Sequence, residues 1–336
     1  MFTVSPSFAL SPDKLVLFNR FDRMTSDLTH PGWVETYTPK IKLVRSFHNF
    51  AISDNAFRNL RQKVNWLYYL SKKKDIKTYS GRRIFSFRCA FITFTLPSKQ
   101  KTPTVDITKR LFNHLLTVLR EKYGMSNYVW RLEFQKNGNV HYHLVTDTYI
   151  DYFAVQKVWN SVLETDGYVS DFAKKHNAMS LHDYVQAHSK GDKSKFEVLK
   201  KRYFKGKSEN WQKPPSVDVK SVISKDKIAS YVSKYFSKSP EGCTICNEYD
   251  TPENSKTMRL WFCSRGLSRL KTISDYLAHV NFCPETLIRA CKGFRRVRVD
   301  YAVLYFFDIS KILGSSRRLL AELFRNYANE QNYVPN

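Results

Sequence analysis

The strongest constraint on the fold is the stretch Arg131–Leu144, which reads RLEFQKNGNVHYHL. The Asn-Gly pair in its middle is typical of a hairpin turn, and the alternating residues on either side are typical of strands. His141 and His143 flank a single residue, so on a strand both imidazoles project from the same face. The stretch therefore predicts an antiparallel hairpin that carries two histidines on one face.

The length of the turn decides whether Glu133 can join these histidines. An even loop would place Glu133 opposite Tyr142, on the other face of the sheet. A loop of Lys136, Asn137 and Gly138, with Gly138 left-handed in a G1 bulge, places Glu133 opposite His141 instead. We predict this odd loop. Two imidazoles and a carboxylate would then form a three-ligand site for a divalent cation, whereas the alternative is a surface hairpin with unrelated histidines.

A second pattern lies at residues 224–238, which read SKDKIASYVSKYFSK. Its apolar residues recur at helical spacing and predict an amphipathic helix. Tyr231 and Tyr235 lie one turn apart on that helix, and each is followed three residues later by a lysine, Lys234 and Lys238. Taken alone, this pattern also fits a core stripe that contains two tyrosines and a solvated lysine face.

Together these motifs resemble the HUH endonucleases, the rolling-circle replication initiators. The tyrosines follow the histidines, as in those initiators, and YVSKYFSK is most similar to the gene A proteins of isometric single-stranded DNA phages. The gene II proteins of filamentous phages belong to the same broad family. A third element, an apolar strand with threonines, is matched by FITFTL at 91–96. The resemblance covers roughly residues 85–270.

The resemblance implies an activity and a set of roles. The enzyme would nick and rejoin single-stranded DNA at an origin by tyrosine transesterification, which leaves a 5′-phosphotyrosine link and a free 3′-hydroxyl. Mg²⁺ or Mn²⁺ would be held by Glu133, His141 and His143. The catalytic residues would be Tyr231, Tyr235, Lys234 and Lys238. The expected partners are single-stranded DNA, origin DNA, and the replication polymerase and helicase of the host, with no membrane and no small-molecule substrate.

Composition agrees with a polyanionic partner. The formal net charge is +25, and 24 Phe, 20 Tyr and 6 Trp accompany the cations. This combination suits phosphate contacts together with stacking on unpaired bases. We expect Arg131, Lys136 and Arg265 to contact DNA. The alternative for the aromatic residues, that they fill the core, does not explain the charge.

The order of the elements predicts an α+β fold with a central antiparallel sheet, as in the RRM-like palm of the HUH initiators, covered by helices. We expect strands at 85–96 and 216–223, and helices at 53–72, from 104 or 106 to 124, and at 152–163 with Phe153 inward. Four prolines in the first forty residues make long regular elements unexpected there.

Three regions are expected along the chain. Residues 1–80 form an N-terminal extension, residues 81–275 form the nickase domain, and residues 276–336 form a basic C-terminal tail region. Both ends are expected to be helical, although Tyr301–Phe307 reads as a strand or a buried segment and Leu319–Tyr327 as a last helix. Residues 166–214 form a basic insertion expected to grip DNA. Its Gly206-Lys207-Ser208 lacks the first glycine of a phosphate-binding loop, so we reject nucleotide hydrolysis.

The six cysteines have no framework spacing and fit a reducing compartment. Cys243 and Cys246 could be half of a zinc site, completed by Cys263 with Cys283 or His279, but the second pair lacks ligand spacing. The sequence shows no signal-peptide pattern and no apolar run long enough to span a membrane. We expect a soluble protein of the host cytoplasm, with a bacterial host favoured, or of the nucleus if the host is eukaryotic.

Two other functions remain open from the sequence. A two-tyrosine transposase would use the same chemistry to mobilise an element. A non-catalytic binder of single-stranded nucleic acid would share the charge and the aromatic residues, but it has no need of the histidine and tyrosine motifs. Covalent attachment to DNA separates the binder from the two enzymes.

Overall fold

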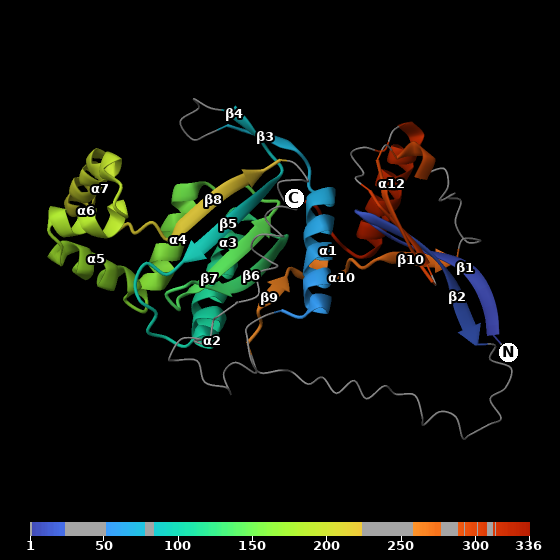
Figure 1. The fold of residues 1–336 in the computed structure, drawn as a ribbon, viewed down its shortest axis with the longest axis horizontal. Helices are drawn as coiled ribbons and strands as arrows, with labels where there is room; N and C mark the ends of the chain where they lie inside the picture. Colours follow the sequence, from blue (N-terminus) through green and yellow to red (C-terminus); the bar gives the residue numbers. More distant parts are fainter. Residues whose placement is uncertain are drawn as a thin grey trace, which may run out of the picture. The chain divides into compact units, whose positions relative to one another are not determined.

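The computed structural model describes residues 2–23, 52–77, 84–223, 258–276, 288–291, 293–300, 302–307, 312 and 314–336. The chain divides into two compact units (Figure 1). The hairpin unit comprises residues 47–60, 71–264 and 336, and the terminal unit comprises residues 1–46, 61–70 and 265–335.

The hairpin unit is built on a five-stranded antiparallel sheet whose strand order is β8-β5-β7-β6-β9. The strands are β5 (Cys89–Thr95), β6 (Tyr128–Phe134), β7 (Val140–Thr146), β8 (Val217–Val222) and β9 (Trp261–Cys263). A short separate hairpin pairs β3 (Lys74–Lys77) with β4 (Ile84–Phe87). The predicted α+β fold and the strand at 216–223 are confirmed, while the strand expected over 85–96 is divided between β4 and β5.

Helices cover one face of this sheet and build its core. They are α2 (Thr104–Asp106), the π-helical segment η1 (Ile107–Phe112), α3 (Asn113–Tyr123) and α4 (Tyr152–Glu164). The core-facing side chains come from alternate strand positions, and the rings of Phe112 and Tyr142 stack with their centroids 3.9 Å apart. Because successive strand residues point to opposite faces, the intervening residues project from the other face. That other face carries the histidines.

The helices predicted at 53–72, 104–124 and 152–163 are confirmed, with two local corrections; the helix predicted at 224–238 lies outside the described residues. The helix over 104–124 begins after Pro103 and has no side-chain cap, whereas Gly124 ends it in the left-handed region at φ 66°. In α4, Phe153 was expected to point inward but is 74 % exposed. The buried face of α4 runs through Val155, Trp159 and Val162. Phe153 lies two residues before Val155, so at 100° per residue it points away from that face.

The basic insertion folds as α5 (Tyr168–Ala178), α6 (Leu181–Ser189), the 3-10 turn η2 (Lys193–Lys195) and α7 (Phe196–Ser208). These helices enclose a small aromatic cluster that includes Tyr184, Tyr203 and Trp211. A Cβ added at Gly206 would lie 2.4 Å from the Trp211 ring, so glycine is needed there for packing. This contact gives a structural reason for the glycine that does not involve phosphate.

The terminal unit contains a second five-stranded sheet, with strand order β10-β1-β2-β12-β11. Its strands are β1 (Phe2–Ser11), β2 (Lys14–Arg23), β10 (Ile273–Tyr276), β11 (Arg295–Val299) and β12 (Ala302–Phe306). Residues 61–70 of α1 (Asp54–Leu70), α10 (Arg265–Arg269) and α12 (Gly314–Glu330) belong to the same unit. The Trp66 and Phe324 rings meet edge to face at 5.1 Å.

The strands near both ends of the chain correct the expectation of helical terminal extensions. β1 and β2 are regular ten-residue strands despite Pro6. Among the described residues β10 pairs with β1 over residues 7–10, so this pairing does not use the N–H group that Pro6 lacks. The strand at 301–307 and the last helix are confirmed by β12 and α12.

The terminal unit also differs from the boundaries drawn at 80/81 and 275/276. β12 pairs with β2, so residues 302–306 and 14–18 share one sheet instead of lying in separate regions. The physical reason is that the pairing satisfies backbone groups of both strands, and Leu15 of β2 and Ala302 of β12 are buried in the folded unit.

Within the described ranges, no helix is long and apolar enough to cross a membrane. Cys89, Cys263 and Cys291 are buried, and burial raises the pKa of Cys89 to about 12. Cys243, Cys246, Cys283 and His279 lie outside the described residues, so the zinc site stays a prediction.

Candidate active site

The turn between β6 and β7 has the predicted odd length. Gln135 N–H donates to the Asn139 carbonyl at 2.9 Å, and Gly138 N–H donates to the Gln135 carbonyl at 2.9 Å. Gly138 has φ 83°, the left-handed conformation of a G1 bulge. Compared with an even loop, this turn shifts the pairing of β7 with β6 by one residue.

This shift brings the three predicted metal ligands to one face. Glu133 lies directly opposite His141, and Arg131 lies opposite His143. The His141 and His143 rings are 4.5 Å apart between centroids. The predicted register is confirmed.

Threonines of β5 hold both histidines. Thr93 lies opposite His143 and Thr95 opposite His141. The distance from Thr93 Oγ1 to His143 Nδ1 is 3.2 Å, and that from Thr95 Oγ1 to His141 Nδ1 is 3.3 Å. When Nδ1–H donates to the hydroxyl, Nε2 keeps its lone pair for a cation. Nδ1 of each ring faces a threonine, so a cation would be bound through Nε2, which in His143 is hydrogen-bonded to the Glu133 carboxylate in this structure.

The distance between Glu133 and His143 fits a shared cation. Glu133 Oε2 lies 2.8 Å from His143 Nε2. Two ligands at right angles on Mg²⁺, each bound at 2.0–2.1 Å, are about 3 Å apart. Among the described residues, however, no three His, Cys, Asp or Glu side chains already have the arrangement of a metal centre. The donor set fits a divalent ion, and binding of that ion stays a prediction.

Replacing Gly138 with alanine is expected to destabilise the protein by about 1–2 kcal/mol and to weaken manganese binding. Open space surrounds the site of the new Cβ, so the cost comes from the left-handed backbone. Gly124→Ala is a matched control, because Gly124 also has positive φ and open space but ends α3, outside the hairpin. Denaturant unfolding should show similar losses for both variants. Titration calorimetry should show weaker manganese binding for Gly138→Ala alone; equal weakening in both would contradict the role of the turn.

Replacing Thr93 with valine is expected to weaken manganese binding about 10- to 100-fold, the usual effect of losing a hydrogen bond to a metal-bound histidine. The variant keeps the size of the side chain but removes the contact to His143 Nδ1. Titration calorimetry measures the effect. Thr165→Val serves as the control, since its hydroxyl donates to the Val162 carbonyl at the end of α4. Wild-type affinity in Thr93→Val would show that the threonine does not orient the ligand.

The three predicted DNA contacts differ in exposure. Arg131 is 2 % exposed, and burial lowers its pKa while neighbouring Glu133 acts in the opposite direction. Arg131 lies beside His143 and can supply positive charge within the sheet face. A DNA strand bound at the surface would not reach its side chain. Lys136, in the hairpin turn, and Arg265, at the start of α10, are exposed.

Sequence reasoning missed the roles of the threonines and of a charged pair on β8. The FITFTL strand was recognised, but not the contacts of its threonines with the imidazoles. Their alternation with phenylalanine was the available signal. Asp218 lies opposite Thr93, and its carboxylate pairs with Lys220 at 2.9 Å. By strand alternation, both charges lie on the histidine face of the sheet.

The predicted catalytic segment, with Tyr231, Lys234, Tyr235 and Lys238, lies outside the described residues. The last described residue before it is Ile223, which follows β8. β8 pairs with β5, the strand that holds the histidines in place. The sequence therefore enters the tyrosine segment directly from the sheet that carries the histidines.

Residues 89–240 match the family model described as replication-associated protein ORF2/gene II protein. This match covers slightly less than half of the chain. It begins at the first residue of β5 and includes the hairpin, the insertion, β8 and both tyrosines. No curated protein and no solved structure matches. The match supports a replication-initiator family for this segment.

Proposed function

We propose that this protein is a replication initiator that nicks and rejoins single-stranded DNA at an origin through a tyrosine nucleophile. The observation that carries the proposal is the β6–β7 register, which gathers Glu133, His141 and His143 on one sheet face. The family match over residues 89–240 supports the replication role. The order of the motifs along the chain supports the HUH type of chemistry.

Glu133, His141 and His143 would hold Mg²⁺ or Mn²⁺. When bound, the ion neutralises charge on the non-bridging oxygens of the scissile phosphate. Thr93 and Thr95 contact Nδ1 of the two imidazoles and would orient the rings so that Nε2 binds the ion. Arg131 adds a permanent positive charge to this face of the sheet.

Tyr231 or Tyr235 attacks the scissile phosphorus. A phenol has a pKa of about 10 and is mostly protonated at neutral pH, so the positive charge of Lys234 and Lys238 serves to favour the phenolate. The new bond joins the tyrosine oxygen to phosphorus, while the bond from phosphorus to the 3′-oxygen breaks. The departing 3′-oxygen takes up a proton and becomes a hydroxyl. The phosphodiester energy is conserved in the 5′-phosphotyrosine, so rejoining needs no nucleotide.

Two tyrosines suit repeated rounds of replication. While one phenol holds the displaced 5′-end, the second cuts the regenerated origin. The free 3′-hydroxyl is the primer that a host polymerase extends, with a host helicase opening the duplex. These partners place the work in the cytoplasm of a bacterial host, or in the nucleus of a eukaryotic one.

The insertion provides a surface for the bound strand. Helix α7 exposes Lys201, Arg202 and Lys205 together with Phe204, which is 55 % exposed. Interleaved cations and aromatic rings bind phosphates and unpaired bases without sequence preference. We assign α7 to holding the single strand during cleavage.

The decisive test is a covalent-adduct assay. With manganese and a single-stranded origin oligonucleotide, the full chain is expected to form a protein–DNA species of lower mobility on a denaturing gel. Chelator should remove this species, and added manganese should restore it. Adduct formation at an unchanged rate in chelator would refute the metal role of the histidines, and no adduct with metal would refute the nickase.

A further inference from the structure

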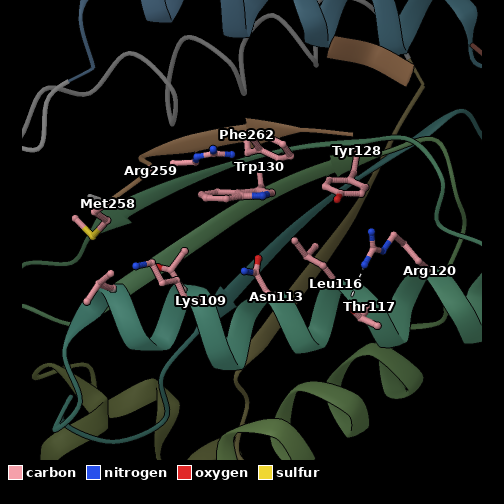
Figure 2. Close-up of a pocket in the computed structure, with 12 residues that line it drawn as sticks. Lys109, Asn113, Leu116, Thr117, Arg120, Tyr128, Trp130, Met258, Arg259 and Phe262 are labelled. Atoms are coloured by element: carbon pink, nitrogen blue, oxygen red, sulfur yellow. Dashed lines mark hydrogen bonds between the residues drawn. The ribbon is translucent and has the colours of Figure 1, made fainter. Parts of the chain in front are cut away.

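A cavity of about 600 Å³ lies in the hairpin unit, on the sheet face opposite the histidines (Figure 2). Side chains of η1 and α3 line one side, and side chains of β6 and β9 line the other. Pockets of roughly 300–1,000 Å³ accommodate small organic ligands. The cavity is therefore large enough for a nucleotide.

Aromatic rings and an arginine form the sheet side of the cavity. Trp130 of β6 and Phe262 of β9 are cross-strand neighbours, so both rings lie on the same face. The Arg259 guanidinium lies over the Phe262 ring, 5.1 Å from its centroid. Phe262 is 39 % exposed, so this pair is accessible from solvent. Rings and guanidinium planes of this kind stack on nucleobases.

The charge of the cavity is positive. Lys109 and Arg120 project from the helical side, as Figure 2 shows, and Arg259 from the sheet side. Of the described residues that line the cavity, none is acidic. Lys109 and Arg120 are eleven positions apart, about 16 Å along a helix, which exceeds the reach of one phosphate. The cations suit an anionic strand better than a single small anion.

We propose that this cavity anchors one nucleotide of the single-stranded substrate away from the scissile phosphate. Its base stacks beside Phe262 and Arg259, while Lys109 and Arg120 bind neighbouring phosphates. The inference rests on the proposed function, because single-stranded DNA is the ligand. It adds a second binding point on the face of the sheet that does not carry the histidines.

The test compares two fluorescein-labelled probes without metal: (dT)20 and an abasic strand of the same length. In the full chain, Arg259→Met combined with Phe262→Leu should weaken (dT)20 binding about 5- to 100-fold, the range expected for one stacked base. Binding of the abasic strand should weaken far less. Lys122→Met is the matched control, since it removes an exposed α3 charge outside the cavity and should affect both probes equally.

Each outcome of this test is informative. Wild-type affinity of the double variant for (dT)20 would overturn the anchor, as would equal weakening for both probes. Displacement of (dT)20 by micromolar dTMP would reassign the cavity to a free nucleotide and overturn the strand anchor. Thermal melting of each variant separates lost binding from lost folding. Because no metal is present, failure of the nickase would show as a missing adduct, independently of these measurements.

Discussion

Replacing His141 and His143 together with alanine is expected to lower covalent-adduct formation at least about 1,000-fold, because a metal ion supplies several kcal/mol of charge stabilisation to phosphoryl transfer. Both imidazoles lie on the Glu133 face of the sheet, and both are held by threonines. Single-turnover assays on an origin oligonucleotide with manganese measure the loss.

Binding of DNA should survive this double substitution. The net charge of +25 is unchanged, because the formal count treats histidine as neutral, so affinity should keep its steep decline with salt. His114→Ala provides the control, since His114 is an exposed residue of α3. A double variant that cleaves at the wild-type rate would remove the histidines from the mechanism. Equal loss of cleavage and binding would indicate misfolding instead.

Replacing Tyr231 and Tyr235 together with phenylalanine is expected to abolish the adduct, whereas either single change should leave part of it. Phenylalanine keeps the ring but removes the nucleophilic oxygen, so one remaining phenol still supports a cut. Quantitative gels with manganese measure the adduct, and peptide mass spectrometry of each single variant identifies the linked residue.

Tyr184→Phe is a control for the loss of a phenol elsewhere, because Tyr184 is buried in the cluster of the insertion. This variant should form the adduct normally. An adduct that persists in the Tyr231/Tyr235 double variant would place the nucleophile on another residue. Complete loss in one single variant would reduce the pair to a single nucleophile.

Elements governed by neighbouring residues were predictable from the sequence. The position of Gly138 after Lys136-Asn137 determined the odd loop, and hence the pairing of Glu133 with His141. Apolar periodicity located α1, α3 and α4, and alternation located β8. These features depend on backbone preferences and contacts within one turn or one hairpin, which a short window of sequence contains.

Predictions based on neighbouring residues were wrong where a segment far away in the sequence determined the structure. Pro6 argued against a strand, yet β1 forms because β2 pairs along its whole length. Phe153 was assigned inward from its apolar character, but the α4 face that meets the sheet lies elsewhere.

The sequence by itself determined the hairpin, its register and the placing of Glu133, His141 and His143 on one face. The tertiary structure decided what surrounds them: threonines of β5 against the imidazoles, the burial of Arg131, and a cavity that joins Arg259 and Phe262 to helix α3. Turn geometry is set by the conformational energy of a few adjacent residues. The surroundings come from segments far apart in the chain, whose pairing is selected by the apolar surface that they bury together.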